Sequence, residues 1–452
     1  MSRKFKTADY DATLDVTVRL GDCLPPDHLA RFVVDTIAQL DLSAIYARYS
    51  TRGGQPYAPD ILLALLFYGY ATGTFSSRKL ERATYETVPF RFIAGNLHPD
   101  HDTLATFRKT FLPELKDLFV QVLLLAQMAG VLKLGNISLD GTKIHADASK
   151  SQAVSYKHLL ALETHLRAEV DELFALSDRV DQGEMPDGLV VSDEIAIRQA
   201  RLARLTEAKA ILEARAKERT ALEQAEYAAK VQEREEKARQ TGRTPRGRAP
   251  KPPTPGPRDK DQYNFTDPQS RIMKHSSTEG FEQDYNAQVA VDQESLLIVG
   301  ESLSNHPTDQ QEVEPTLDSI PPELGSPEAA ALDNGYFSEA NIALFERRQI
   351  DAYIATGRDP HHPSWWERFV ILPEPPADDA SPKLKMAYKL KSALGQAIYR
   401  VRKCTVEPVI GIIKEVLGFR QFSLRGEQAA AGEWCLVCLA FNLKRLHSLL
   451  AG

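Results

Sequence analysis

The sequence predicts an α/β protein, with a mixed sheet of about five strands flanked by helices, an all-α N-terminal domain and an inserted helical hairpin. Three observations lead to this fold class. Apolar residues recur at helical spacing through residues 1–130. Short apolar or alternating runs, which are typical of strands, end at 140, lie between 286 and 303, and recur at 329–333 and 351–355. From 150 to 260 the spacing is helical again, so this tract interrupts the strands.

In the N-terminal region, helical spacing is clear at 28–40, 61–70 and 104–128, and residues 76–83 begin like a capped helix. The segment HisProAspHisAsp at 98–102 has the composition of a metal site. Asp100 or Asp102 is better explained as the N-cap of the helix that follows, because a carboxylate there accepts a hydrogen bond from a backbone amide.

Two apolar stripes follow residue 150 and predict an antiparallel helical hairpin. The first stripe spans Leu159 to Leu173 and the second spans Ile195 to Leu212. Residues 244–257 are rich in proline and are expected to form an extended, mobile linker. Near the C-terminus, Cys435 and Cys438 lie in an amphipathic stretch with no second cysteine pair, so we expect them to pack in the core rather than bind zinc.

Three acidic residues stand out because of their flanking sequence. Asp140 follows an apolar run and precedes Gly141, so we expect it at a glycine turn. Asp333 again ends a short apolar run, and Glu407 precedes Pro408 at what we expect to be a helix start. Each acid also has an ordinary structural explanation, either in a turn or in the first turn of a helix.

A cluster of these carboxylates would need protons or cations. Two like charges about 4 Å apart repel by roughly 4 kcal/mol at an effective dielectric constant near 20. Magnesium prefers carboxylate oxygens and leaves positions open for phosphate and water, and paired ions stabilise both oxygens of a phosphodiester displacement. Three gathered acids would therefore indicate phosphodiester chemistry.

The strings SLDGTKIHADASK, ALDNGYFSEANI and VEPVIGIIKEVLGFRQFSLRG, in this order, resemble the three acidic motifs of bacterial insertion-sequence DDE transposases with an RNase H-like core. The segments 57–83 and 98–108 resemble the helical N-terminal domain of such proteins, so the resemblance covers residues 20–450. It implies that Asp140, Asp333 and Glu407 are catalytic and bind two Mg²⁺ ions, with Mn²⁺ as a possible substitute.

The third motif of many relatives also carries a tyrosine, an arginine and a lysine at fixed intervals. Lys414 stands at the expected position, but Tyr399 is one place early, and Lys403 stands beside Arg402 where an arginine is expected. One residue rotates a helical side chain by about 100°, so no role is assigned to Tyr399.

The net charge of −7 is an average over the chain, whereas DNA responds to local potential. Between 400 and 425 six basic residues stand against two acids, and between 239 and 260 seven stand against one. Either run also fits a solvated surface. In the third motif, we expect contacts to DNA from Lys414, Lys403, Arg402 and Arg420. We also expect them from Arg78 and Lys79, in the first turn of an N-terminal helix. That helix also fits a generic helix pair that does not contact DNA.

These observations predict a helical N-terminal domain at 1–130 for DNA-end binding, an RNase H-like catalytic domain at 131–150 and 261–452, and an insertion at 151–260. The insertion fits dimerisation, DNA bracing or simple decoration. Trp365 and Trp366 could stack on a flipped base, and they fit an ordinary surface or core pair better.

The function that the resemblance implies is a DNA transposase that cleaves strands at the element's ends and joins the freed 3′-hydroxyl to target DNA. Its partners would be double-stranded DNA, as terminal inverted repeats and target, and further copies of the chain on that DNA. We find no apolar run long enough to span a membrane, and a bacterial, nucleoid-associated cytoplasmic location is expected. Two alternatives remain open: a catalytically inactive DNA-binding regulator, and a nuclease that never joins ends.

Overall fold

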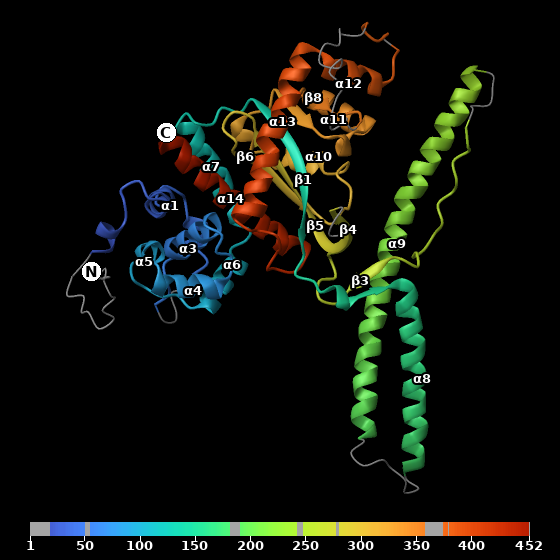
Figure 1. The fold of residues 1–452 in the computed structure, drawn as a ribbon. Coiled ribbons are helices and arrows are strands. Elements are labelled where there is room, and N and C mark those ends of the chain that lie inside the picture. The colour runs from blue at the N-terminus through green and yellow to red at the C-terminus, as the bar shows by residue number, and fades with distance from the viewer. Residues whose placement is uncertain are drawn as a thin grey trace, which may run out of the picture. The chain divides into compact units, whose positions relative to one another are not determined.

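The computed structural model describes residues 19–49, 55–180, 190–241, 247–276, 280–357, 374–377 and 379–451 (Figure 1). It is a mixed α/β protein, which confirms the α/β class that the sequence predicts. The chain forms two compact units. Unit 1 comprises residues 1–142, 286–424 and 428–452, and unit 2 comprises residues 143–285 and 425–427. The predicted N-terminal region therefore falls in the same compact unit as most of the sheet.

The N-terminal part of unit 1 is helical, as the apolar spacing predicts. Its helices are α1 (Leu29–Ile37), α2 (Ser43–Tyr46), α3 (Pro59–Ala71), α4 (Ser77–Glu86), α5 (Val88–Ile93), α6 (His101–Thr110) and α7 (Leu115–Met128), after a short 3₁₀ turn, η1 (Leu20–Cys23). Helix α3 is buried on nearly all sides, with Pro59 in its first turn, where a missing backbone N–H costs no hydrogen bond. The Asp100 carboxylate accepts a hydrogen bond from the Thr103 amide, which confirms it as the N-cap of α6.

A buried polar network joins this helical part to the last helix, α14 (Glu427–Ala451). The Tyr70 hydroxyl donates to Glu433 at 2.8 Å, and Arg108 donates to the Tyr70 hydroxyl at 2.7 Å. Glu433 also accepts hydrogen bonds from the backbone amides of Ser423 and Leu424. A buried charge is tolerated only when it is paired and hydrogen-bonded, so this network fixes how α3, α6 and α14 pack.

Helix α14 is long and apolar enough to cross a membrane by length and composition, but 61% of its most apolar window is buried inside the protein. That burial is typical of a core helix. Cys435 and Cys438 are both free and fully buried on this helix, as expected of core residues.

Over the residues that the structure describes, the sheet has six strands, one more than expected. They are β1 (Asn136–His145), β4 (Arg271–Ser276), β5 (Gly280–Asp292), β6 (Ile298–Ser304), β7 (Ala329–Leu332) and β8 (Asp351–Ile354). The order is β4-β5-β1-β7-β8, with β6 also paired to β5. Strands β1, β7 and β8 are parallel neighbours, whereas β5 and β6 form the predicted antiparallel hairpin. The additional strand, β4, is antiparallel to the first part of β5.

Helices pack on the sheet of unit 1. Helix α13 (Ala393–Gly411) packs against β7 and β8, α12 (Pro382–Lys391) and α11 (Glu339–Arg348) against β8, and α10 (Val313–Asp318) against β6. Ile398 of α13 packs on Ala329, Ala331 and Tyr353, and the two alanines let the helix approach the strands closely. Short 3₁₀ turns η3 (Pro322–Leu324) and η4 (Asn334–Tyr336) flank β7, and a π-helical turn (Ile412–Val416) continues α13.

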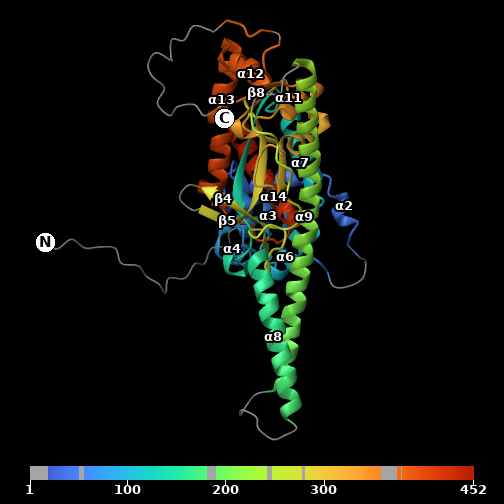
Figure 2. The same cartoon turned by 90° about the vertical axis from the view of Figure 1, so that its right-hand side faces the viewer.

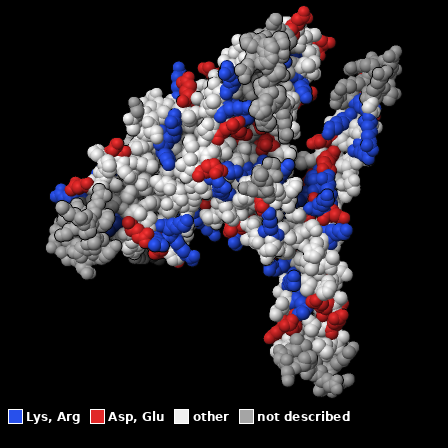
Figure 3. Space-filling model, viewed as in Figure 1, with Lys and Arg blue, Asp and Glu red and all other residues white. Residues whose placement is uncertain are grey.

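Unit 2 contains the predicted helical hairpin, made of α8 (Tyr156–Val180) and α9 (Val191–Thr241), which lie side by side (Figures 1 and 2). Their shared core consists of residues from both predicted stripes, including Leu159, Leu166, Leu205 and Leu212. Tyr263 of β3 (Gln262–Asn264) also belongs to this core. Strand β3 pairs with β2 (Ala153–Ser155), which follows the 3₁₀ turn η2 (Lys150–Gln152). On the face of the hairpin seen in Figure 3, basic and acidic side chains are interspersed.

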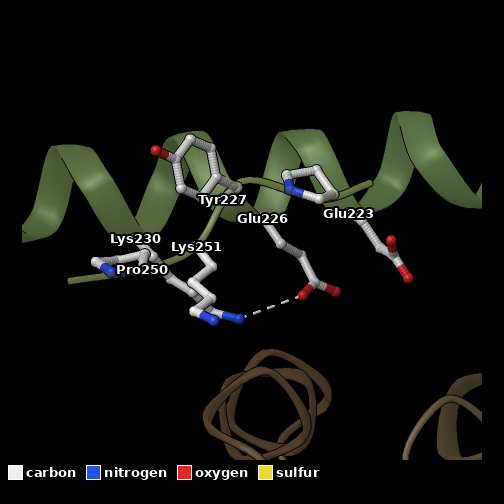
Figure 4. A pocket seen from close by; sticks show the side chains of 7 residues that line it. Glu223, Glu226, Tyr227, Lys230, Pro250 and Lys251 are labelled. Carbon is white, nitrogen blue, oxygen red and sulfur yellow. Dashed lines mark hydrogen bonds and ion pairs between the residues drawn. The ribbon is translucent and has the colours of Figure 1, made fainter. Parts of the chain in front are cut away.

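The proline-rich segment is held against α9 over its described residues, 247–257. Arg234 and Arg219 of α9 donate hydrogen bonds to the carbonyls of Gly247 and Gly256. Figure 4 shows the pocket where Pro250 and Lys251 lie beside Glu226, Tyr227 and Lys230 of the helix. The sequence predicted an extended, mobile linker, and over residues 247–257 two arginines of α9 donate hydrogen bonds to its carbonyls. Arg243, Arg246, Trp365 and Trp366 lie outside the described residues.

Candidate active site

Two of the predicted acids occupy matching positions on neighbouring parallel segments, with Asp140 inside β1 and Asp333 directly after β7. Leu139 of β1 pairs with Leu332 of β7, and Asp140 and Asp333 are the next residue on each chain segment. Neighbouring strands lie about 4.8 Å apart, so the two residues lie side by side. Burial is the main cause of the raised pKa of Asp140, and the negative charge of the neighbouring Asp333 adds to it.

Asp140 and Gly141 do not form the expected turn, because β1 continues through both residues to His145. The glycine is required for a different reason. A Cβ atom at position 141 would lie 2.8 Å from Cδ of Gln288, a side chain of the neighbouring strand β5. Gly141 therefore leaves room for a glutamine to cross the strand beside Asp140.

Glu407 does not begin a helix, as its position before Pro408 had suggested. Helix α13 starts at Ala393, where Ser392 caps it, and both Glu407 and Pro408 lie in its last turns. A proline at this point removes one backbone hydrogen bond, and the π-helical turn follows directly. The hydroxyl of Thr405 on α13 donates to Ser138 of β1 at 2.9 Å, which fixes the helix against the strand that carries Asp140.

Arg402 joins the first and third acids. Its Nη1 donates to Oδ2 of Asp140 at 2.7 Å, and its Nη2 lies 3.5 Å from Oε1 of Glu407. The Arg402 side chain is 8% exposed, compared with 18% for Asp140 and 49% for Glu407. Arg402 was expected to contact a phosphate, whereas here the guanidinium is buried between carboxylates.

Burial dominates the electrostatics of the cluster. It raises the pKa of Asp140 to about 6; the neighbouring Arg402 opposes this shift and the negative charge of Asp333 adds to it. Burial also raises the pKa of Tyr336 far above its usual value, and the charges of Asp140, Asp309 and Asp333 contribute. The site gathers negative charge around the largely buried Asp140, and Arg402 neutralises it only in part.

Sequence reasoning missed a polar group beside the acids. The Gln288 Nε2 donates to Asn286 at 2.8 Å and to Asp309 at 3.1 Å, and its Oε1 accepts from the Tyr336 hydroxyl. Asn286 also donates to Asp309, at 2.8 Å. Asn286 and Gln288 are two residues apart in the part of β5 that continues into the apolar run Val289–Val291, so their side chains share one face. That alternation was the signal that could have identified them.

The remaining predicted residues lie in unit 1 at different exposures. Lys414, on the π-helical turn, donates to the Thr142 hydroxyl at 3.2 Å, so it lies close to the strand that carries Asp140. Lys403 is exposed on α13, and Arg420 is exposed and paired with Glu415. Arg78 and Lys79 are exposed in the first turn of α4.

The donors present fit a divalent cation of the magnesium class. Asp140 and Asp333 supply hard carboxylate oxygens from adjacent strands, and Glu407 supplies a half-exposed carboxylate within reach of Arg402. Burial disfavours the charged form of Asp140 and raises its pKa, and a bound cation would favour that charged form.

Comparison with known families gives the class of protein. Residues 18–110 match a transposase domain (DUF772), and residues 377–447, which contain Arg402, Glu407 and Lys414, match a transposase DDE domain. The chain is therefore a DNA transposase. The pairing of these two domains supports an insertion-sequence DDE transposase, an enzyme that depends on a divalent metal, and nothing in the matches favours a catalytically inactive regulator. No curated protein and no solved structure matches the chain.

Proposed function

We propose that Asp140, Asp333 and Glu407 are the catalytic residues of this transposase and bind two Mg²⁺ ions, which Mn²⁺ can replace. The observation that carries the proposal is the register of β1 and β7, which puts Asp140 and Asp333 side by side, with Glu407 tied to Asp140 through Arg402. Asp309, held by Asn286 and Gln288, adds a further negative charge close to these acids.

The order of the strands supports an RNase H-like catalytic core. Taking β1, β5, β6, β7 and β8 as the first to fifth strands, their order across the sheet is third, second, first, fourth and fifth. Helix α13, which carries the third acid, follows α12 after the fifth strand and is hydrogen-bonded to the first strand through Thr405 and Ser138. We assign residues 131–150 and 261–452 to this core, residues 1–130 to DNA-end binding, and the hairpin and linker at 151–260 to an insertion.

The reaction that we propose is hydrolysis of one strand at each end of the element, followed by attack of the freed 3′-hydroxyl on target DNA. Divalent ions bound there would activate the attacking oxygen and stabilise the leaving one. To bind a cation, the Asp140 carboxyl group must be deprotonated, and its hydrogen bond with Arg402 must break. Arg402, once released, has a guanidinium suited to a phosphate.

Basic residues around the acids are the proposed DNA contacts. Lys414, Lys403 and Arg420 follow or flank Glu407 on the same stretch of chain, and Arg78 and Lys79 begin α4. We propose that the first group holds the strand being cut and that the second helps to bind terminal inverted repeats. The active form would be an oligomer assembled on DNA in the bacterial cytoplasm, associated with the nucleoid.

The test is an assay of cleavage and joining on DNA that carries the element's ends. The unaltered chain should nick the ends and join them to target DNA only with Mg²⁺ or Mn²⁺. Asp140→Asn, Asp333→Asn and Glu407→Gln should each abolish nicking while end binding persists. Asp318→Asn, which changes an exposed carboxylate paired with Arg348, should retain full activity.

Two outcomes would overturn the proposal. Normal nicking by Asp140→Asn would remove that residue from the site. Nicking without joined products would identify a hydrolytic nuclease.

A further inference from the structure

Unit 2 contains a cluster of metal-ligating side chains that does not include the three acids. His145 ends β1, Asp284 lies on β5 and His275 lies on β4, so each residue comes from one of three neighbouring strands. Their possible ligand atoms all lie within 4.8 Å of one another. Ligands on paired strands are held more rigidly than ligands on loops.

The contacts within the cluster are direct. Nδ1 of His145 lies 2.8 Å from Oδ1 of Asp284, and Nδ1 of His275 lies 3.0 Å from Oδ2 of the same carboxylate. The two imidazole rings stack with centroids 4.1 Å apart and an interplanar angle of 18°. The Nδ1 atoms of both histidines therefore contact the same carboxylate, one at each oxygen.

A local irregularity of the sheet directs His275 toward this point. The pairing of β4 with β5 shifts register between Lys274 and Ser276, so His275 is the bulged residue. Bulges reorient a side chain that regular pairing would direct elsewhere, and they are common beside functional sites. A backbone hydrogen bond of 2.9 Å from Ala146 to Gln283 holds the end of β1 against β5.

We propose that His145, His275 and Asp284 form a second metal site, which binds one first-row transition-metal ion of the zinc class. Two imidazoles and one carboxylate are ligands that zinc takes, whereas magnesium prefers oxygen ligands and retains its waters. Zinc bonds of about 2.0–2.1 Å in a tetrahedral arrangement place ligand atoms about 3.3 Å apart. The observed separations of 2.8 and 3.0 Å need to open by only a few tenths of an ångström.

The burial of the three side chains gives the site one accessible direction. Asp284 is fully buried and His275 is 7% exposed, whereas His145 is 31% exposed. Three protein ligands leave a fourth position for water, which would lie on the His145 side. The bound ion would join β1, β5 and β4 and stabilise this end of the sheet independently of the acidic triad.

The experiment measures zinc binding by the full chain after removal of metals, in excess Mg²⁺ and in the Asp140→Asn background, which disables the acidic site. One Zn²⁺ per chain should bind and raise the unfolding temperature. His145→Gln and His275→Gln should each weaken zinc binding by at least about tenfold. His306→Gln, which changes an exposed histidine paired with Glu312, is the matched control and should bind normally.

A second measurement requires no histidine variant. X-ray absorption at the zinc edge of the Asp140→Asn chain should show two imidazole ligands and no sulfur. The proposal is overturned if no zinc binds in excess Mg²⁺, if both histidine variants bind as well as the control, or if the zinc has only oxygen ligands. Sulfur ligands would also overturn it, because they would place the ion at one of the four cysteines.

Discussion

Arg402 and Asp140, 262 positions apart in the chain, form a hydrogen-bonded ion pair of 2.7 Å. Arg402 also reaches Glu407, so one buried guanidinium is shared by two of the three proposed metal ligands. A divalent cation that binds these carboxylates must compete with the arginine. The strength of this ion pair therefore bears on both the pH dependence and the metal affinity of the enzyme.

Strand cleavage should depend on pH through Asp140. Because the pKa of this carboxyl is raised to about 6, its metal-binding form is lost as the pH falls through that value. At limiting Mg²⁺, the cleavage rate should rise with pH up to about 7 and then level off. Arg402→Gln removes the charge that opposes the pKa shift, so the midpoint should move to higher pH. A midpoint near 4, the ordinary value for aspartate, would contradict the assignment.

The contribution of Asp140 to the free energy of unfolding should change with pH in the opposite direction to the cleavage rate. The folded pKa of Asp140 lies near 6 and the unfolded value is 3.8, so between these values the folded chain keeps a proton that the unfolded chain loses. The stabilisation from Asp140 is complete below pH 3.8 and is lost as the pH rises through about 6.

In metal-free buffer at pH 7, Asp140→Asn should therefore raise the free energy of unfolding, by roughly 1–3 kcal/mol. Chemical denaturation measures this change, and Asp318→Asn serves as the exposed control. A clear loss of stability in Asp140→Asn would show that Arg402 stabilises the charged form more than burial destabilises it.

Gly141→Ala should damage the site without altering any acid. The added Cβ would lie 2.8 Å from Cδ of Gln288, whose amide is held by Asn286, Asp309 and Tyr336. Crowding of this kind costs about 1–3 kcal/mol, and we expect lower thermal stability together with slower cleavage. Gly135→Ala is the control, because its nearest neighbouring atom is 3.9 Å away. Equal effects of the two alanines would show that the strand tolerates the added methyl group.

Glu433→Gln should destabilise unit 1 strongly. Glu433 is fully buried and accepts hydrogen bonds from Tyr70 and from the Ser423 and Leu424 amides, and Arg108 lies 3.6 Å away. Removing its charge leaves the buried Arg108 without a counter-charge, which costs about 3–5 kcal/mol. Equilibrium denaturation should show this loss, whereas Glu86→Gln, at an exposed pair with Arg82, should change little. A change as small as that of the control would show that Arg108 finds another partner.

The sequence predicted the elements that depend on local spacing. The helices near 28–40 and 61–70, the hairpin at 286–303 and the N-cap at Asp100 all follow from periodicity or capping, which neighbouring residues determine. The apolar stripes from Leu159 to Leu212 likewise predicted the α8–α9 core.

Features that depend on distant residues were not predictable in this way. Gly141 resembles a turn residue in its local sequence, but its role comes from Gln288 on a strand nearly 150 residues later. Glu407 beside Pro408 resembles a helix start, but α13 begins earlier, because Ser392 caps it. The pairing of Arg402 with Asp140 and the convergence of His145 with His275 required the strand order itself.

Diffraction from crystals soaked in Mn²⁺, recorded at a wavelength where manganese scatters anomalously, tests the central proposal most directly. The account predicts an anomalous peak in contact with carboxylate oxygens of both Asp140 and Asp333, with Arg402 displaced from Asp140. A map with no peak there, and with the 2.7 Å pair between Arg402 and Asp140 unchanged at saturating Mn²⁺, would contradict it.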